Sequence, residues 1–274
     1  AASALDSALT ALGGAAGHIT LRRGAYTLGT AVPAGTVIEG EGIGLVTVTL
    51  TANTAAGLNT KITDLTVGAS AFIFSTAGRL ERVGGAGSIT LLTGASSDTT
   101  SFTGVLVTGQ GVRCTNYSGQ SLALSNATDF SADTVTLGSM ASDASNLTFN
   151  STTNVAIRNL RIAGSAAQST QALIASFATN VGLLFDAVRV ERTSASIGAL
   201  LNLSSATSRA IVNDGTFTLT RGAQFLTTTS TSLVTFRNCA FTAPAANTDA
   251  AGAARFLAGA VSFLDCSVAQ QYNS

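Results

Sequence analysis

The second half of the chain repeats one short pattern at nearly constant intervals. In each copy an apolar residue and one spacer precede an Asn or Asp, and further apolar residues follow. The repeated positions are Asn159, Asp186, Asn213, Asn238 and Asp265, at intervals of 27 (159 to 186), 27 (186 to 213), 25 (213 to 238) and 27 (238 to 265). A second short apolar segment lies between successive copies. Repeats of this length that hold two or three short strands and no helix are typical of a solenoid.

Among solenoids, the pattern favours a parallel β-helix. The Leu-and-Asn signature of leucine-rich repeats is absent, and the blades of a β-propeller need longer repeats. We therefore predict an all-β chain, a single right-handed parallel β-helix of roughly ten coils. Asp64 fits the same pattern in the first half, whereas residues 84–150 show short apolar strands without a clear register.

A short amphipathic helix is predicted ahead of the first strand, over residues 3–12. Ala4, Leu5, Ala8, Leu9 and Leu12 form an apolar stripe, and Gly13 and Gly14 end it. The open end of a β-helix exposes strand edges that invite aggregation, and such a helix can cover that end. The predicted organisation is a cap helix and turn over residues 1–17 and a β-helix over 18–274.

The opening segment also carries a family resemblance. The residues "LDSALTALGGAAGHITLRRGAYTL" (5–28), followed by "GTVIEGEGIG" (35–44), resemble the start of the pectate-lyase-like β-helix superfamily. The shared features are a short helix, a Gly-rich turn, an apolar strand, a Gly-x-Tyr turn and an Ile-x-Gly-x-Gly turn. The resemblance implies a right-handed parallel β-helix. The superfamily includes pectin-degrading enzymes, phage tailspikes and other virion appendages.

The regular Asn and Asp series has two interpretations. As a functional feature it is a row of carboxylates for metal binding or acid–base chemistry. As a structural feature it is an inward ladder at a turn, whose side chains bond to backbone and to one another along the stack. One residue per coil favours the ladder. Asp186 and Asp265 then need donors nearby, because an unpaired buried carboxylate is costly.

The catalytic motifs of the family's enzymes are missing. The "NTD", "GHG" and "RIK" segments of polygalacturonase-like members do not occur, and the aspartate clusters of calcium-dependent pectate lyases find no match. Glycoside hydrolysis needs two carboxyl groups roughly 5–10 Å apart, and Glu191 and Asp214, about one coil apart, are the candidate pair. A solvated-surface interpretation of both is favoured. With no Trp and three Tyr, the chain offers few aromatic platforms for a sugar.

The remaining chemically reactive residues indicate no cofactor and no metal. His18 is the single histidine and is expected to be a solvated turn residue. Cys239 and Cys266 are predicted to stack in neighbouring coils as buried, free thiols, with a disulfide as the alternative, and Cys114 is predicted to be in the core. The "GEGIG" segment (40–44) lacks the Lys-Ser/Thr and the helix of a phosphate-binding loop.

The predicted outer face suggests an interface. The residues that precede the ladder positions are expected to point outward. These residues are Phe185, Val212, Leu264, Arg158 and Arg237. Three of the five are apolar, so the column predicts a homo-oligomer, a trimer in the first instance, or docking to other virion proteins.

Composition limits the other classes of partner that the chain is expected to bind. Formal net charge is zero, so no nucleic acid is expected, and no apolar run is long enough for a membrane span. A surface glycan is retained as a candidate ligand.

The sequence therefore favours a non-enzymatic virion appendage, a tailspike, fibre or capsid-attached protein that serves as a rigid spacer or host-attachment element. The alternatives are a carbohydrate-active enzyme, such as a phage depolymerase or polysaccharide hydrolase or lyase, and a bacterial surface adhesin. The expected location is the virion or the extracellular space.

Overall fold

A computed structural model gives the structure of the chain, which forms two compact units, residues 1–119 and 120–274. The structure describes residues 4–51, 57–68, 72–74, 76–138, 140–165, 167–168, 170–192, 198–203, 209–219, 225–228, 232–244, 256–257 and 260–271.

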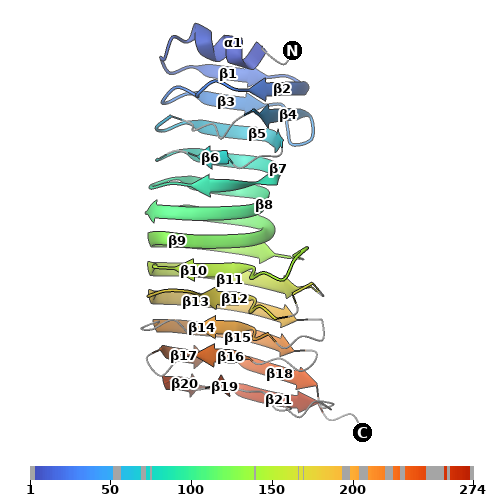
Figure 1. Ribbon diagram of the computed structural model, residues 1–274, viewed down its shortest axis with the longest axis vertical. Coiled ribbons are helices and arrows are strands. Elements are labelled where there is room, and N and C mark those ends of the chain that lie inside the picture. The colour runs from blue at the N-terminus through green and yellow to red at the C-terminus, as the bar shows by residue number, and fades with distance from the viewer. Residues whose placement is uncertain are drawn as a thin grey trace. The chain divides into compact units, whose positions relative to one another are not determined.

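The first unit consists of one helix and a stack of parallel strands (Figure 1). The strands pair in parallel with partners from the neighbouring coils, so each lies directly over a strand of the next coil. Its elements are α1 (Ala4–Ala11), β1 (His18–Leu21), β2 (Gly24–Leu28), β3 (Val37–Gly40), β4 (Val46–Leu50), β5 (Lys61–Gly68), β6 (Phe72–Phe74), β7 (Arg79–Leu91), β8 (Ser96–Gln110) and the start of β9 (Arg113–Leu137).

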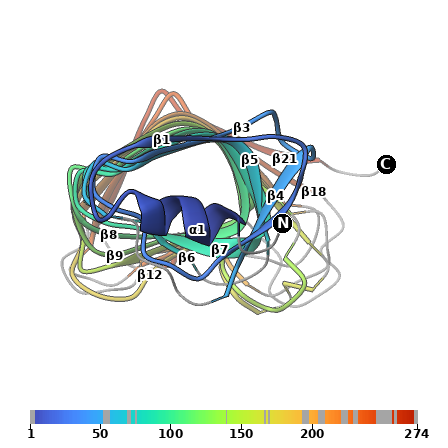
Figure 2. The same ribbon diagram turned by 90° about the horizontal axis from the view of Figure 1, so that it is seen from above.

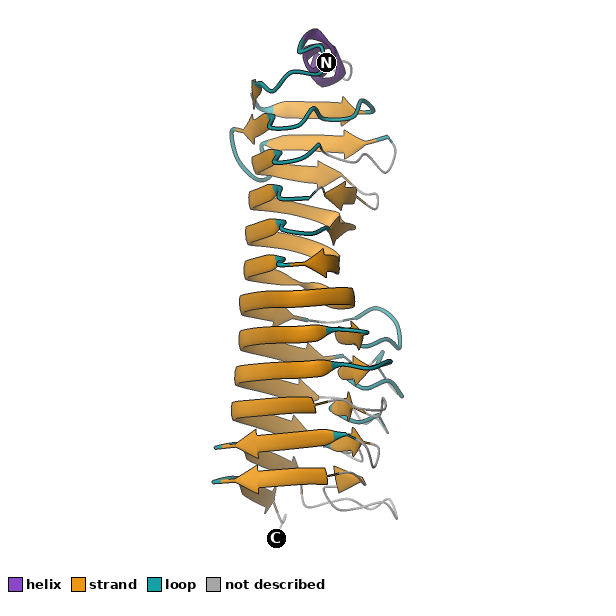
Figure 3. Ribbon diagram, turned by 90° about the vertical axis from the view of Figure 1, so that its left-hand side faces the viewer, coloured by secondary structure: helices purple, strands orange, loops and turns teal. Residues whose placement is uncertain are grey.

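The second unit is built in the same way from the rest of β9 onward. Figure 3 shows that strands make up nearly all of the regular structure in both units. Its further strands are β10 (Leu147–Asn150), β11 (Thr153–Gly164), β12 (Ile174–Ser176), β13 (Val181–Arg192), β14 (Leu201–Leu203), β15 (Arg209–Leu219), β16 (Leu226–Thr228), β17 (Leu233–Arg237), β18 (Ala240–Pro244), β19 (Phe256–Leu257), β20 (Ala260–Leu264) and β21 (Ser267–Gln271).

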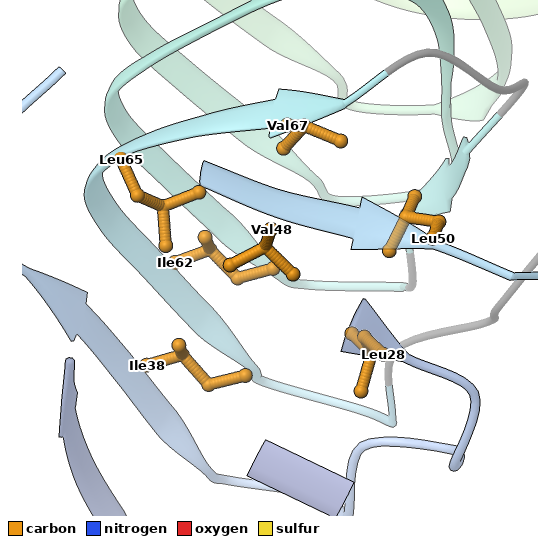
Figure 4. A pocket seen from close by; sticks show the side chains of 7 residues that line it. All are labelled: Leu28, Ile38, Val48, Leu50, Ile62, Leu65 and Val67. Atoms are coloured by element: carbon orange, nitrogen blue, oxygen red, sulfur yellow. The ribbon is translucent and has the colours of Figure 1, made fainter. Parts of the chain in front are cut away.

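This architecture confirms the predicted parallel β-helix. Within each strand the side chains alternate between the interior and the surface, as in β4, where Val46, Val48 and Leu50 are buried and the threonines between them are not. Figure 4 shows how side chains from β2 to β5 meet inside the coils of the first unit. They leave a cavity of only about 10 Å³, lined entirely by apolar groups, so the interior is a packed core and not a ligand site.

The predicted cap helix is also present, as α1. Leu5 and Leu9 are buried, and Gly13 and Gly14 follow the helix with positive φ angles of 59° and 86°. Figure 2 shows α1 lying across the end of the coils of the first unit. Asp6 fixes it there, because its Oδ1 accepts hydrogen bonds from the backbone N–H groups of Gly29 and Thr30, both at 2.9 Å.

One series of corners, stacked from coil to coil, is made by residues whose φ is positive; other residues with positive φ, such as Ala77 and Asn154, stand elsewhere in the coils. In the first unit the residues of this series are Asp64, Arg82, Thr99 and Asn116, and in the second they are Thr134, Asn159, Ala187, Asp214, Asn238 and Asp265, which we call the corner residues. Successive corners lie closer together in the sequence from Asp64 to Asn116 than they do from Asn159 to Asp265. The coils of the first unit are therefore shorter, which explains why residues 84–150 show no register at a period near 25.

In the part of the chain that the structure describes, we find no helix of the length and apolar character that a membrane crossing requires.

Candidate functional site

The corner residues form the most regular polar feature of each unit. Asn and Asp suit these positions because they tolerate the left-handed backbone conformation better than other non-glycine residues. Each corner lies directly above the corner of the next coil, so neighbouring side chains meet along the stack. In the second unit Asn159 donates to Asp133, which precedes a corner residue, over 2.7 Å, and Asn238 donates to Asp214 over 2.6 Å.

These bonds differ from the predicted inward ladder, because Asn159 and Asn238 bond to Asp133 and Asp214, which are not among the predicted ladder residues. Asn159, Asn238 and Asp265 are exposed at corners and do not point into the core. Asp186 and Asn213 are half-buried and stand one residue before the corner, because Arg158 pairs with Asp186 and Asp186 pairs with Asn213. The corner residues of those two coils are Ala187 and Asp214.

This one-residue difference also overturns part of the predicted interface. Arg158, Arg237 and Leu264 do lie on the surface. Phe185 and Val212, however, are each only 1% exposed and belong to the core. A shift of one residue along a strand moves a side chain to the opposite face, so the apolar column predicted from the sequence does not exist.

On β13 and β15, the outward apolar side chains lie one position earlier than predicted. Leu184 pairs with Ile211, and both point away from the core beside Val181 and Leu233. Together with Arg209, these residues border a shallow groove of about 450 Å³. We call the four residues Val181, Leu184, Ile211 and Leu233 the apolar strip; Ile211 is 38% and Leu233 46% exposed.

The two candidate catalytic carboxylates occupy positions that are out of register. Glu191 pairs with Thr218, whereas Asp214 is a corner residue four positions before Thr218. Four residues of extended chain span up to about 13 Å, so the backbones of the two residues do not lie opposite each other. Glu191 lies 3.6 Å from Nη2 of Arg189, and Asp214 accepts from Asn238. Both carboxylates therefore have structural partners.

A charged face on the first unit escaped the sequence analysis. Glu81 receives Nζ of Lys61 at 2.8 Å and Nε of Arg79 at 2.5 Å. In the neighbouring corner column, Arg82 binds both carboxylate oxygens of Asp64, each at 2.6 Å. In the sequence, this face is indicated by charged residues that recur from one short coil to the next. Because these coils are shorter than 25 residues, the recurrence does not appear at a period near 25.

This face also places two carboxylates in register on neighbouring strands. Glu81 and Asp98 occupy in-register positions on β7 and β8, so their backbones are about 4.8 Å apart. A glycosidase of this kind needs one carboxyl group that keeps its proton. Here the hydrogen bond from Lys61 outweighs the opposing effect of burial and holds the pKa of Glu81 below its ordinary value. Glu81 therefore stays ionised, and Asp98 accepts a hydrogen bond from Asn116 at 3.1 Å.

A buried charge next to Glu191 also escaped the sequence analysis. Arg192 is fully buried at the end of β13, and its guanidinium donates to the backbone oxygens of Gln168 and Gln171 at 3.2 and 2.5 Å. Burial lowers the pKa of Arg192 to about 10, so it remains a cation at neutral pH. Its role is to hold the backbone at both glutamines.

The histidine and cysteines offer no metal centre. Exposed His18 forms a 2.9 Å contact with Glu39. All three cysteines are free, with Cys114 and Cys239 buried and Cys266 half-buried, which corrects the expectation that Cys266 is fully buried. Among the described residues, no group of three or more His, Cys, Asp or Glu side chains is arranged to hold a metal ion.

Comparisons with known proteins give similarity in structure only. No protein-family model and no curated protein sequence matches the chain. Among solved structures, the A-module of mannuronan C-5 epimerase AlgE6 from Azotobacter vinelandii is 13% identical, with a TM-score of 0.48 over 98% of this chain and 94% of that one. The A-module of AlgE4 from the same organism is 10% identical, with a TM-score of 0.45 over 98% and 92%. A mutant tailspike protein of E. coli bacteriophage HK620, in complex with a pentasaccharide, is 11% identical, with a TM-score of 0.39 over 97% of this chain and 62% of that one.

Proposed function

We propose that the chain is a non-enzymatic structural β-helix of a virion appendage, which acts as a rigid spacer or host-attachment element and assembles as a homo-oligomer. The observation that supports this proposal is that outward-facing carboxylates bind side chains of neighbouring coils. In the described coils Asp64, Glu81, Asp133 and Asp214 each bind a side chain from a neighbouring coil. Carboxylates engaged in this way hold the stack together and leave little acid–base capacity for catalysis.

The rigidity of such a spacer follows from the same contacts. Backbone hydrogen bonds join each coil to the next along every paired strand. The corner side chains add a second set of bonds between coils. Each exposed pair contributes little by itself, about 0–1 kcal/mol, but the pairs repeat from coil to coil.

The virion context rests on the resemblance of residues 4–44 to the pectate-lyase-like superfamily, which includes phage appendages. Self-association is supported by the apolar strip, whose exposed side chains lie next to one another and not singly. A formal net charge of zero, with 14 basic and 14 acidic residues, means that copies of the chain do not repel one another.

The proposal is tested by measuring assembly and catalysis on the same preparation. Sedimentation of the purified chain is expected to give a mass above that of a single chain, with a trimer as the first expectation. Incubation with a panel of bacterial surface polysaccharides is expected to release no shorter fragments. A chain that stays monomeric at high concentration and cleaves a polysaccharide would contradict the proposal.

The second candidate function is a carbohydrate-active enzyme, and the in-register carboxylates Glu81 and Asp98 are the observation that favours it. In the same assay, Glu81→Gln and Asp98→Asn test this face, and Glu191→Gln and Asp214→Asn test the pair chosen from the sequence. Cleavage that one of these sets removes identifies the enzyme and its site. Binding of a polysaccharide without cleavage favours an attachment role, whether on a virion or as an adhesin.

A further inference from the structure

The two cysteines near the end of the second unit occupy equivalent positions in neighbouring coils. Ala240 pairs with Ser267, so Cys239 and Cys266, each one residue earlier, lie side by side just before the parallel strands β18 and β21. The backbone bond from Ser267 N to the oxygen of Cys239, at 2.9 Å, shows the same register.

The two thiols also make matching contacts. Cys239 Sγ lies 3.2 Å from the backbone oxygen of Arg237 and 3.5 Å from that of Val212. Cys266 Sγ lies 3.3 Å from the oxygen of Leu264 and 3.5 Å from that of Phe236. Because Val212 pairs with Phe236 and Arg237 pairs with Leu264, these are the same two contacts displaced by one coil.

This placement satisfies the first requirement for a disulfide. Neighbouring chains of the stack lie about 4.8 Å apart, and disulfide-bonded cysteines have Cα atoms about 4.4–6.8 Å apart. Because the Cβ atoms of a disulfide lie about 3.5–4.5 Å apart, the bond needs a rotation of both thiols and a small approach of the two coils at this point. We propose that Cys239 and Cys266 form an oxidisable dithiol whose disulfide ties the coil of β20 and β21 to the coil of β17 and β18.

Accessibility sets the order of the reaction. Cys266 is half-buried, whereas Cys239 is 2% exposed, so an oxidant meets Cys266 first. The oxidant is a low-molecular-weight disulfide. The Cys266 thiolate attacks one of its sulfurs, a mixed disulfide forms, and the first small thiolate leaves and takes up the proton that Cys266 lost.

The second step closes the bridge. Cys239 loses its proton and its Sγ attacks Cys266 Sγ, which expels the second small thiolate, and this takes up the proton. In total two protein thiols are oxidised and one small disulfide is reduced to two thiols. Burial, reinforced by the nearby Cys266, raises the pKa of Cys239 to about 11, so closure becomes faster as the pH rises toward that value.

Cys114 provides an internal control. It is buried on β9 in the first unit, where burial raises its pKa to about 11, and neither of the other two cysteines belongs to that unit. The folded chain is incubated with oxidised glutathione, free thiols are then blocked, and the digest is analysed by mass spectrometry without reduction. We expect a linked Cys239–Cys266 peptide and unmodified Cys114.

Variants separate the proposal from its alternatives. Cys114→Ser should form the bridge as fully as the parent, whereas Cys239→Ser should stop at a mixed disulfide on Cys266. Hydrogen exchange in β20 and β21 should slow on oxidation of the parent and not of Cys239→Ser. Three results overturn the proposal: a mixed disulfide on Cys266 of the parent that never resolves, a bridge between Cys266 residues of two chains, or no oxidation until denaturant is added. None of these outcomes bears on whether the chain is a virion component.

Discussion

A single left-handed residue turns the chain at each corner. Asn159, with a φ of 49°, and Asn238, with a φ of 51°, are typical corner residues, but Arg82 and Ala187 occupy the same conformation. For most L-residues this conformation costs about 1–2 kcal/mol. Asn and Asp reduce the cost and also reach the next coil with a side-chain hydrogen bond. Corner chemistry, and not burial, therefore explains Asn159, Asn238 and Asp265, whereas Asp186 and Asn213 stand one residue before their corners.

The corner interpretation predicts different costs for the same substitution at two positions. Asn159→Leu places a bulkier residue in the left-handed conformation and removes the bond to Asp133, so we expect it to lower the free energy of unfolding by about 1–2 kcal/mol. Asn213→Leu is the matched control. Asn213 is half-buried on the outer side of β15, and its replacement should change stability by less than about 0.5 kcal/mol. Urea unfolding measures the free energy of unfolding of both variants. A larger loss for Asn213→Leu than for Asn159→Leu would support the buried ladder and contradict the corner interpretation.

The Asp64–Arg82 pair predicts a change in titration. The hydrogen bonds from Arg82 outweigh burial and hold the pKa of Asp64 below its ordinary value. A carboxyl group with a lowered folded-state pKa stabilises the fold above its unfolded pKa, about 3.9, and this contribution disappears as the pH falls through the folded value. Arg82→Gln should therefore raise the pKa of Asp64, as followed by NMR of the carboxyl carbon. It should also weaken the pH dependence of stability in that acidic window. An unchanged Asp64 titration would show that Arg82 is not its partner in solution.

Among the elements, α1 has a distinct role because it covers the strand edges at the end of the first unit. Leu9, on the buried side of α1, is 2% exposed, and Leu9→Ala should lower the free energy of unfolding by about 2–4 kcal/mol. Ser7→Ala, on the exposed side of the same helix, is the control and should have almost no effect. Static light scattering should also show faster aggregation of Leu9→Ala, because loosening the helix exposes β2, against which α1 packs. Equal behaviour of the two variants would mean that α1 does not protect this end.

The elements also show how far the sequence determines the prediction. The strands, the parallel stacking and the cap helix follow from alternation, period and the opening segment, and the structure has all three. The register of residues 84–150 did not follow, because the corners at Arg82, Thr99 and Asn116 are too closely spaced for a period near 25. The faces of Phe185 and Val212 were misassigned for a related reason. The spacing between successive corners varies from coil to coil in the second unit. A pattern that accepts either Asn or Asp does not show whether the matching residue stands at the corner or one residue before it.

At the scale of the whole molecule, each unit presents a different surface at the third position before a corner. In the first unit this position carries Lys61, Arg79, Ser96 and Arg113, of which Lys61 and Arg79 pair with Glu81. In the second unit it carries Ser131, Ala156, Leu184, Ile211, Thr235 and Ser262. The first surface is polar and partly ion-paired, whereas the second exposes apolar groups at Leu184 and Ile211 that water solvates poorly. The second surface is therefore the one expected to bind another chain.

This assignment leads to a prediction that separates interface from core. Leu184→Asp combined with Ile211→Asp places two charges on the apolar strip, so we expect the assembly to dissociate to single chains while the strand-rich circular dichroism spectrum persists. Thr216→Asp, an exposed change on another face of β15, is the control and should leave the sedimentation coefficient unchanged. Val212→Asp should instead unfold the second unit, because it buries a carboxylate in an apolar core with no partner. If the Leu184→Asp, Ile211→Asp variant keeps the mass of the parent assembly, the chains associate through a different surface. If Val212→Asp dissociates the assembly without loss of structure, the side chain of Val212 faces the partner. The register assigned to β15 is then wrong.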